Sequence, residues 1–222
     1  MAKDKNESLA LLALQSDFIL EFAKFLLKSN ALQFGTFTLA SGKPSPYYID
    51  LRMLPSFPKH FRLAINAMKE AVAGKIGSNF DTFASVPTSG LVFGSALAYE
   101  MVKPFVYVRK ESKGHGTSKL VEGHLPSGAK VVIVDDVATT GTSVSHAVQA
   151  IRANGGIVDD VVALVSRQEG AEEHLKKMNV RLTAVATVKD IVNTLHKAGL
   201  IDDNTLESVM KQMASQADYD NE

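Results

Sequence analysis

The stretch VVIVDDVATTGTS, residues 131–143, decides the fold. Its first four residues are apolar and β-branched, which predicts a strand buried on both faces, as in a parallel sheet. We expect Asp135 and Asp136 where this strand leaves the core, and the small residues after them to turn into a helix. A strand, a polar turn and a helix in this order form the repeating unit of an open α/β domain.

The same alternation recurs along the middle of the chain. Strands are expected at 80–87, 104–108, 130–136, 157–167 and 181–188, and helices at 91–101, 143–153 and 171–178. The pattern predicts an open, mainly parallel sheet flanked by helices. Ligands of such sheets bind outside the carboxyl ends of the strands. The expected site therefore comprises residues 87–90, 109–119, 135–143 and 166–168.

The two ends of the chain differ from this middle part. A helix is expected from residue 8 to about 30, a hairpin over 34–52 and a helix over 57–76. Two polar helices should follow residue 190, and the tail 215–222 should be disordered. We therefore predict an N-terminal helix and hairpin (1–56), an α/β core (57–190) and a C-terminal helical segment (191–222).

Composition excludes several classes of protein. Lys plus Arg and Asp plus Glu number 24 each, so no overall charge favours nucleic acid or a membrane surface, and neither is an expected partner. The chain has no cysteine, which excludes disulfides, thiolate metal ligands and a cysteine nucleophile. The apolar stretch 9–27 contains charged residues and is too interrupted for a membrane span. A cytoplasmic location is expected.

The acid pair and the loop after it suit a sugar phosphate. A loop of small residues at a helix N-terminus offers backbone N–H groups to a phosphate, and its hydroxyls add further donors. Gly141 allows a close approach or a positive φ. Two neighbouring carboxylates suit vicinal hydroxyls or a divalent cation. The alternative is an ordinary capped helix start, with Thr142 or Ser143 as the N-cap.

The whole stretch resembles the ribose-phosphate signature of the type I phosphoribosyltransferases, which is four hydrophobic residues, two acids and T-x-G-T. The resemblance implies that family's fold, with phosphoribosyl pyrophosphate (PRPP) as donor and Mg²⁺ as cofactor. It also implies that the two acids contact the metal, directly or through water. The PRPP-binding residues that it implies here are Asp135, Asp136, Val137, Ala138, Thr139, Thr140, Gly141, Thr142 and Ser143.

Three further stretches are similar to the orotate phosphoribosyltransferases. Residues 37–52, FTLASGKPSPYYIDLR, resemble their amino-terminal signature, and residues 107–116, YVRKESKGHG, their mobile catalytic loop, R-K-x-x-K-x-H-G. Residues 166–170, SRQEG, resemble their segment beside the base. The resemblance covers nearly the whole chain. It implies an enzyme, a pentosyltransferase, that converts PRPP and orotate to orotidine 5′-phosphate and pyrophosphate in pyrimidine (UMP) biosynthesis, with 1–56 as a hood that carries the base-binding hairpin.

The basic loop carries Arg109, Lys110, Lys113 and His115 with only one acid. Positive groups here would stabilise the charge that grows on departing pyrophosphate. The resemblance implies that all four bind PRPP and that the loop reaches into the neighbouring subunit's site, so that a homodimer shares its active sites. Lys113 and His115 would then act across the interface, and Arg109 is also implied to be catalytic. The alternative is a solvated polar loop with a chance basic bias.

Other residues gain roles from the same resemblance. Thr88 and Ser89 lie in a turn that would contact pyrophosphate, although the turn could be an ordinary strand-to-helix connection. Arg167 presents a planar fork suited to the carboxylate or ring oxygens of orotate, although such an arginine could be a surface ion-pair partner. The remaining orotate-binding residues that we expect are Thr139, Tyr47, Tyr48 and Ile49, the hairpin residues having cross-strand packing as their alternative role.

One position departs from the family's pattern. Many members have a lysine where this chain has Ala40, and Lys43 is a candidate to replace it in PRPP binding, with a solvated turn residue as the alternative. Two other functions stay open from the sequence alone: transfer to another base, such as a purine, and a non-catalytic regulator that senses PRPP. The histidines expected to be structural or on the surface are His60, His124, His146, His174 and His196.

Overall fold

The computed structural model describes residues 16–39, 42–109 and 120–219. The chain forms two compact units. The first combines Met1–Ala67 with Ala186–Glu222, and the second is Met68–Val185. Because its two parts come from the two ends of the chain, the first unit brings together segments that the sequence keeps far apart. The functional division at residues 56 and 190 stays a prediction.

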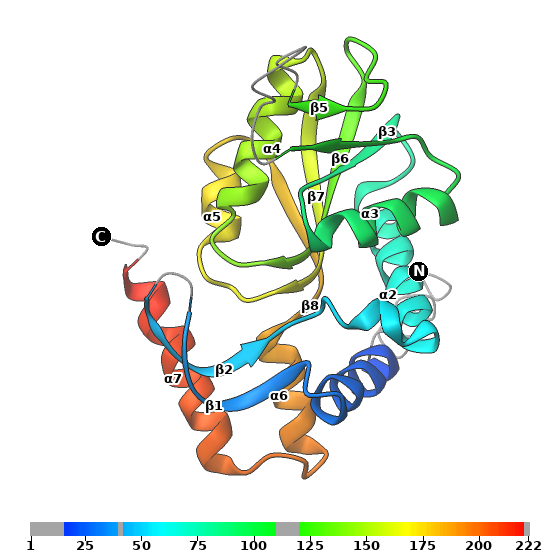
Figure 1. Cartoon of the computed structure of the whole chain (residues 1–222). Coiled ribbons are helices and arrows are strands. Elements are labelled where there is room, and N and C mark those ends of the chain that lie inside the picture. The colour runs from blue at the N-terminus through cyan, green and yellow to red at the C-terminus, as the bar shows by residue number, and fades with distance from the viewer. Residues whose placement is uncertain (1–15, 40–41, 110–119, 220–222) are drawn as a thin grey trace, which may run out of the picture. The chain divides into compact units, whose positions relative to one another are not determined.

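The second unit contains the predicted sheet, and its strand order is β5-β4-β3-β6-β7-β8. Strand β3 pairs in parallel with β4 and β6, β6 pairs in parallel with β7, and β5 pairs antiparallel with β4. The expected open, mainly parallel sheet is confirmed (Figure 1). The strand bounds are Thr82–Ser85 (β3), Phe105–Val108 (β4), Val121–Glu122 (β5), Lys130–Ala138 (β6), Ile157–Ser166 (β7) and Arg181–Thr187 (β8).

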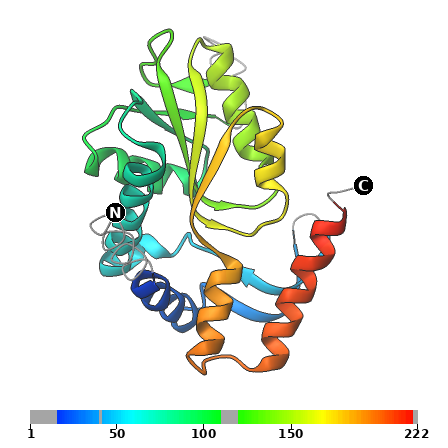
Figure 2. The same cartoon turned by 180° about the vertical axis from the view of Figure 1, so that it is seen from behind.

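Helices α3 (Ser89–Glu100) and α4 (Thr142–Ala153) cover opposite faces of this sheet (Figures 1 and 2). Ala84 and Val86 of the β3 region pack in the apolar cluster of α4. Ser85, which points to the other face, lies against Gly94 of α3, where a Cβ would overlap its Oγ. The core is therefore dry on both sides of β3 and β6, which explains their continuous apolar sequence.

The strand order reverses between β3 and β6. From β3 the chain passes to β4 on one side of the sheet, and it later returns to β6 on the other side. At such a reversal the loops at the carboxyl ends separate and leave a crevice for ligands. Residues 87–90 follow β3 here, and residues 139–141 follow β6. This end of the sheet also carries Arg109, after β4, and Arg167, after β7.

Two expectations about the central stretch are corrected. The strand is two residues longer than the expected range 130–136, because β6 runs to Ala138, where it pairs with Ser166 of β7. The ten-residue β7 offers partners over this whole length. The N-cap of α4 is Gly141, in the left-handed conformation with φ 81°, and not Thr142 or Ser143. A glycine caps here by its backbone conformation and not by a side-chain hydrogen bond.

The first unit contains the expected hairpin. Strands β1 (Leu32–Thr38) and β2 (Pro44–Ile49) pair antiparallel, with an irregularity between Phe34 and Phe37. Residues 16–28 are helical. Helix α6 (Val188–Lys197) begins with a capping box in which Thr187 and Asp190 each bond the other's backbone N–H.

The C-terminal helix α7 (Asp203–Tyr219) lies alongside β2 (Figure 1). It runs through residues 215–219, which we expected to be disordered, so that expectation is wrong for these five residues. The other helical segments are a 3-10 turn, Leu54–Ser56, helix α2, Pro58–Ala71, a π turn, Val72–Ile76, and helix α5, Ala171–Lys176. Within the described ranges, no helix has both the length and the apolar character needed to cross a bilayer.

Candidate active site

The acid pair lies at the carboxyl end of β6 and is almost fully buried. Asp135 is 9% exposed and Asp136 is 7% exposed. The backbone N–H of Asp136 donates to Asp135 Oδ1 at 3.0 Å. Burial, and secondarily the adjacent charge of Asp136, raise the pKa of Asp135 well above its usual range. Asp135 therefore tends to keep its proton until a ligand or cation compensates a negative charge at this position.

Ser89 connects the acid pair to the turn after β3. Its hydroxyl donates to Asp136 Oδ1 at 2.8 Å, across the reversal of the strand order. Ser89 is the first residue of α3 and Thr88 is its N-cap, and the peptide bond between Pro87 and Thr88 is cis. The expected turn therefore touches the acid pair directly. It combines a helix N-terminus with hydroxyl groups, a suitable environment for an anion.

Gly90 lets the start of α3 approach Asp135 closely. A Cβ at this position would lie 2.9 Å from Asp135 Oδ1 and 3.3 Å from the carbonyl oxygen of Val134. Contacts as short as the first do not occur for real Cβ atoms, so any larger residue would force the helix or the acid to move. The absence of a side chain at Gly90 is thus a requirement of the site.

The loop between β6 and α4 packs against the first residue of α5, Ala171. The N–H of Ala171 donates to the Thr139 carbonyl at 3.1 Å. A Cβ on Gly141 would lie 3.2 Å from Ala171 Cα, so the two backbones nearly touch. The hydroxyls of Thr140 and Thr142 lie 3.0 Å apart in an exposed pair. Two exposed hydroxyl groups thus lie at the N-terminus of α4, and their binding to a ligand stays a prediction.

Arg167 lies directly after β7 and is buried, with 5% exposure. Its backbone N–H donates to the Ala138 carbonyl at 2.9 Å, which joins it to the end of β6. Its Nε donates to Glu169 Oε1 at 2.8 Å, and both side chains are largely enclosed. The alternative role of a surface ion-pair partner is therefore wrong in its location, although Arg167 does form an ion pair. Glu169 fixes the direction of the guanidinium plane.

The basic loop is described only at its base. Arg109 is the first residue after β4, and its guanidinium forms an ion pair with Glu122 of β5 at 3.2 Å. This contact holds Arg109 close to the edge of the sheet. Lys110, Lys113 and His115 lie outside the described residues, as does Ala40.

The expected orotate-binding residues of the hairpin belong to the first unit. Tyr47 and Ile49 are buried, and the ring of Tyr48 lies 5.7 Å from that of Phe37 on the paired strand. Tyr48 thus takes part in the cross-strand packing that we considered as its alternative role.

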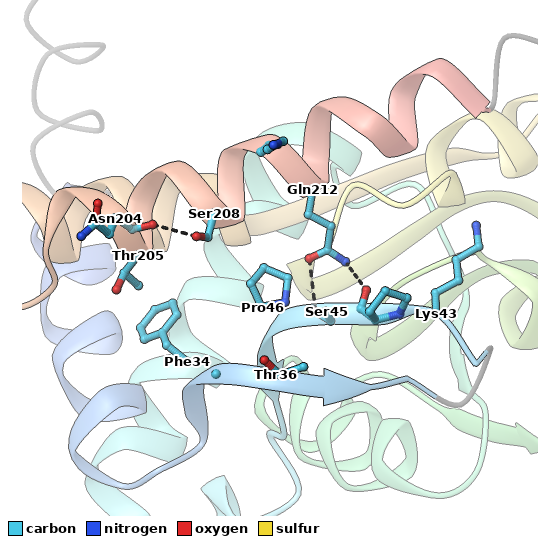
Figure 3. A pocket seen from close by; sticks show the side chains of 12 residues that line it. Phe34, Thr36, Lys43, Ser45, Pro46, Asn204, Thr205, Ser208 and Gln212 are labelled. Carbon is cyan, nitrogen blue, oxygen red and sulfur yellow. Dashed lines mark hydrogen bonds between the residues drawn. The ribbon is translucent and has the colours of Figure 1, made fainter.

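Lys43 lies beside the hairpin turn, at a groove of about 1190 Å³ (Figure 3). The groove runs between the hairpin and α7, and Gln212 crosses it with a hydrogen bond to the Pro44 carbonyl and another from Ser45 Oγ. Figure 3 shows the side chain of Lys43 at one end of the groove. Lys43 is exposed, which fits the alternative of a solvated turn residue.

Sequence reasoning missed three residues that support the site. Glu169 orients Arg167, Ser145 bonds the Gly141 carbonyl, and His174 contacts the carbonyl of Thr140. We had expected His174 to be structural or on the surface. Its position beside the loop depends on how α5 packs, and no spacing in the sequence reports this contact.

The oxygen atoms at the end of β6 are the type of ligand that Mg²⁺ prefers. Among the described residues, no group of three or more His, Cys, Asp or Glu side chains gathers as a metal cage. Mg²⁺ usually keeps several waters and takes one or two carboxylates together with substrate phosphates. The pair Asp135 and Asp136 fits that second mode of binding.

Comparisons with known proteins agree with this geometry. Residues 53–196 match the family model described as phosphoribosyl transferase domain. The orotate phosphoribosyltransferase of Cenarchaeum symbiosum (strain A) is 46% identical over 193 residues, which cover 86% of this chain and 96% of that protein.

Solved structures extend the similarity. The crystal structure of the orotate phosphoribosyltransferase of Aeropyrum pernix has a TM-score of 0.71 at 43% identity, covering 81% of this chain and 99% of that one. The Mycobacterium tuberculosis H37Rv orotate phosphoribosyltransferase in complex with PRPP has a TM-score of 0.63 at 27% identity, covering 78% and 98%. The family match over residues 53–196 includes the whole region from β3 to β7.

Proposed function

The chain belongs to the orotate phosphoribosyltransferases of the phosphoribosyl transferase domain family, and from that membership we propose how its residues transfer the phosphoribosyl group of PRPP to orotate. The products are orotidine 5′-phosphate and pyrophosphate, in pyrimidine biosynthesis. The observation that carries the assignment of roles is the meeting of Asp135, Asp136 and the hydroxyl-rich loop 139–143 at the end of β6.

The acids hold the ribose of the donor. Asp136 has one carboxylate oxygen fixed by Ser89, which leaves its other oxygen to accept from a ribose hydroxyl. Asp135 lies beside it on the same strand, so that the pair can accept from the vicinal 2- and 3-hydroxyls. Two fixed acceptors restrict the rotation of the sugar and hold C1 in place for attack.

The loop 139–143 holds the 5-phosphate. The N-terminus of α4 begins there, and its N–H groups and dipole favour a dianion. Thr140 and Thr142 present hydroxyls on its exposed side. Binding at this end leaves the opposite end of the ribose, with its pyrophosphate, toward the turn at Thr88 and Ser89.

The leaving group is stabilised by positive charge and by backbone donors. The C1–oxygen bond breaks with its electron pair passing to pyrophosphate, and the ribose gains oxocarbenium character. We propose that the N-terminus of α3 stabilises the growing negative charge on pyrophosphate. The basic loop residues are assigned the same role: Arg109, Lys110, Lys113 and His115. Bound Mg²⁺, held through Asp135 and Asp136 directly or through water, would neutralise part of the same charge.

The acceptor is positioned by Arg167. Orotate is an anion, and the planar guanidinium can bind its carboxylate or ring oxygens through two parallel hydrogen bonds. Glu169 keeps this plane in one orientation. The ring nitrogen attacks C1 from the face opposite to pyrophosphate. We assign no strong general base, because the ring N–H, conjugated with carbonyl groups, can pass its proton to water as the nitrogen attacks. Thr139, Tyr47, Tyr48 and Ile49 are assigned to the base from the family resemblance alone.

We assign two further properties from the resemblance. The enzyme is a homodimer in which the loop of one subunit completes the site of the other, and it works in the cytoplasm. A mixture of inactive Lys113→Ala and inactive Asp136→Asn proteins tests the shared site, because hybrid dimers contain one intact site. Recovered turnover supports sharing, and no recovery after subunit exchange contradicts it.

The test of the function is ultraviolet loss of orotate on mixing the protein with PRPP and Mg²⁺. Adenine, hypoxanthine and uracil serve as parallel acceptors. Mg²⁺-dependent turnover with orotate alone supports the proposal. Turnover with a purine would show that the enzyme uses another base as its acceptor. PRPP binding without turnover of any base would indicate a non-catalytic regulator.

A further inference from the structure

We propose that His174 is a positioning residue for the donor's 5-phosphate, acting through the backbone of the loop 139–143. This inference rests on the proposed function, which places the phosphate at that loop. His174 belongs to α5 and lies 3.1 Å from the Thr140 carbonyl through Nδ1 and 3.3 Å from Ser145 Oγ through Nε2. Its ring thus bridges the loop and the first turn of α4.

The contact with Thr140 fixes which ring nitrogen carries hydrogen. A carbonyl oxygen can only accept, so Nδ1 of His174 is the donor in this pair. Nε2 faces Ser145 Oγ, whose single hydrogen is donated to the Gly141 carbonyl. The contact of Nδ1 with the Thr140 carbonyl is therefore the one through which His174 acts on the loop.

Three consecutive carbonyls of the loop are bound, two by residues of α5 and one by Ser145 of α4. Ala171 binds that of Thr139 at 3.1 Å, and His174 binds that of Thr140. The Gly141 carbonyl accepts from both the N–H and the hydroxyl of Ser145, at 2.8 and 2.9 Å. Of the three, only the Thr140 carbonyl depends on a side chain alone.

The direction of a carbonyl sets the direction of the next N–H. In a trans peptide unit the two groups point in opposite directions. The bound carbonyls therefore turn the N–H groups of Thr140 and Gly141 away from α5 and the N–H of Thr142 away from Ser145. Successive N–H groups that share a direction bind anions well. Without the histidine, the peptide between Thr140 and Gly141 would lose its side-chain restraint, and glycine permits rotation there.

The experiment measures binding of two halves of the donor separately. Ribose 5-phosphate probes the loop, and pyrophosphate probes the turn at Thr88 and Ser89. His174→Ala should weaken ribose 5-phosphate about tenfold, the size expected for one lost orienting hydrogen bond. It should leave pyrophosphate binding unchanged and raise the KM for PRPP more than it lowers kcat. His146→Ala, at an exposed histidine of α4, is the matched control and should change neither ligand.

Two conservative variants separate positioning from folding. An asparagine amide can replace Nδ1 of a histidine, whereas a glutamine amide reaches the position of Nε2. His174→Asn should recover most of the ribose 5-phosphate affinity, and His174→Gln should not. Unchanged ribose 5-phosphate binding in His174→Ala, or equal losses for ribose 5-phosphate and pyrophosphate, would overturn the inference. If the unmodified protein binds pyrophosphate but not ribose 5-phosphate, the phosphate assignment of the loop itself is wrong.

Discussion

Ser89 and Asp136 lie 47 residues apart in the chain and are joined by a hydrogen bond of 2.8 Å across the reversal of the strand order. The bond joins the first residue of α3 to the carboxyl end of the central strand β6. It fixes the carboxylate that we assign to the ribose and, with the same hydroxyl, places the start of α3 where pyrophosphate should leave. Sugar and leaving group are therefore positioned by one connected structure.

Removal of this hydroxyl should reduce catalysis. Ser89→Ala frees the Asp136 carboxylate to rotate, and a hydrogen bond to a charged group contributes roughly 1.5–3 kcal/mol. We expect kcat/KM for PRPP to fall about tenfold or more. Ser89→Thr keeps a hydroxyl and serves as the control. Equal activities for the alanine and threonine variants would show that the bond does not orient the acid.

The buried acid should make the ligand-free protein less stable as the pH rises. The pKa of Asp135 is raised in the folded state by burial and then by the charge of Asp136. From the unfolded value near 4 up to the folded pKa, the folded protein binds more protons, so the free energy of unfolding falls with increasing pH. Asp135→Asn keeps an acceptor for the Asp136 N–H but carries no charge, and should escape this loss.

Thermal unfolding across the pH range measures the effect. Asp135→Asn should unfold several degrees above the unmodified protein at neutral pH, since about 1 kcal/mol shifts Tm by roughly 2–4 °C in a chain of this size. The gap should close below about pH 4, where both side chains are neutral. Turnover should nevertheless fall by about two orders of magnitude, because the side chain that we assign to a ribose hydroxyl and to Mg²⁺ loses its charge. A variant less stable than the parent at neutral pH contradicts the raised pKa.

Gly90→Ala should damage the site even though the change is small. The new Cβ would lie 2.9 Å from Asp135 Oδ1, so the start of α3 or the acid must shift. We expect kcat/KM to fall at least tenfold and the free energy of unfolding to drop by about 1–3 kcal/mol. Gly74→Ala is the matched control, because a Cβ there meets nothing within 4 Å. Full activity in Gly90→Ala would mean that the acid tolerates displacement.

Arg167→Lys should weaken the binding of orotate and leave the binding of PRPP nearly unchanged. Lysine keeps the charge but lacks the planar fork and cannot keep the same pair of hydrogen bonds. We expect the KM for orotate to rise about tenfold or more with the KM for PRPP nearly unchanged. Glu169→Gln, which weakens the ion pair at 2.8 Å, should give a smaller change in the same direction. A rise in the KM for PRPP alone would show that Arg167 binds the donor PRPP and not orotate.

Lys43 and Lys113, both candidate PRPP-binding residues, should differ in their contribution to kcat. Lys43 is exposed beside the hairpin turn, whereas Lys113 belongs to the catalytic-loop pattern R-K-x-x-K-x-H-G. We expect Lys113→Ala to lower kcat by at least tenfold and Lys43→Ala by less than threefold, as for an exposed charge. Steady-state kinetics with both substrates saturating provide the comparison. Equal losses, or a larger loss for Lys43→Ala, would contradict this order.

The alternation of strands and helices was predictable because runs such as residues 131–134 and 161–165 are continuously apolar between turn residues. These runs do not indicate which strands, far apart in the sequence, pair with one another in the sheet. The extension of β6 beyond Asp136 to Ala138 accompanies the ten-residue length of β7, and the two-residue strand β5 is defined by its pairing with β4. Both features are set by neighbours and not by local sequence.

The same reason separates the predicted site residues from the missed ones. Asp135, Asp136 and the loop are contiguous in the chain, so one motif contains them. Glu169 and His174 support that motif from the segment after β7, and their contacts arise from tertiary packing. The role of Gly141 as N-cap was missed because its hydroxyl neighbours are the usual capping residues, yet Thr140 and Thr142 contact each other instead.

The placement of both acids within the central ladder of the sheet has a consequence for the order of events during heating. Backbone amides of β6 are paired on both sides over Val131–Val134, directly before the acids, and Asp135 pairs with Ala163 of β7. Amides paired on both sides in a sheet exchange with solvent only when the whole domain opens. The carboxylates that we assign to the ribose thus adjoin the part of the sheet that we expect to open last. Loss of sugar-phosphate binding on heating should coincide with global unfolding and not precede it.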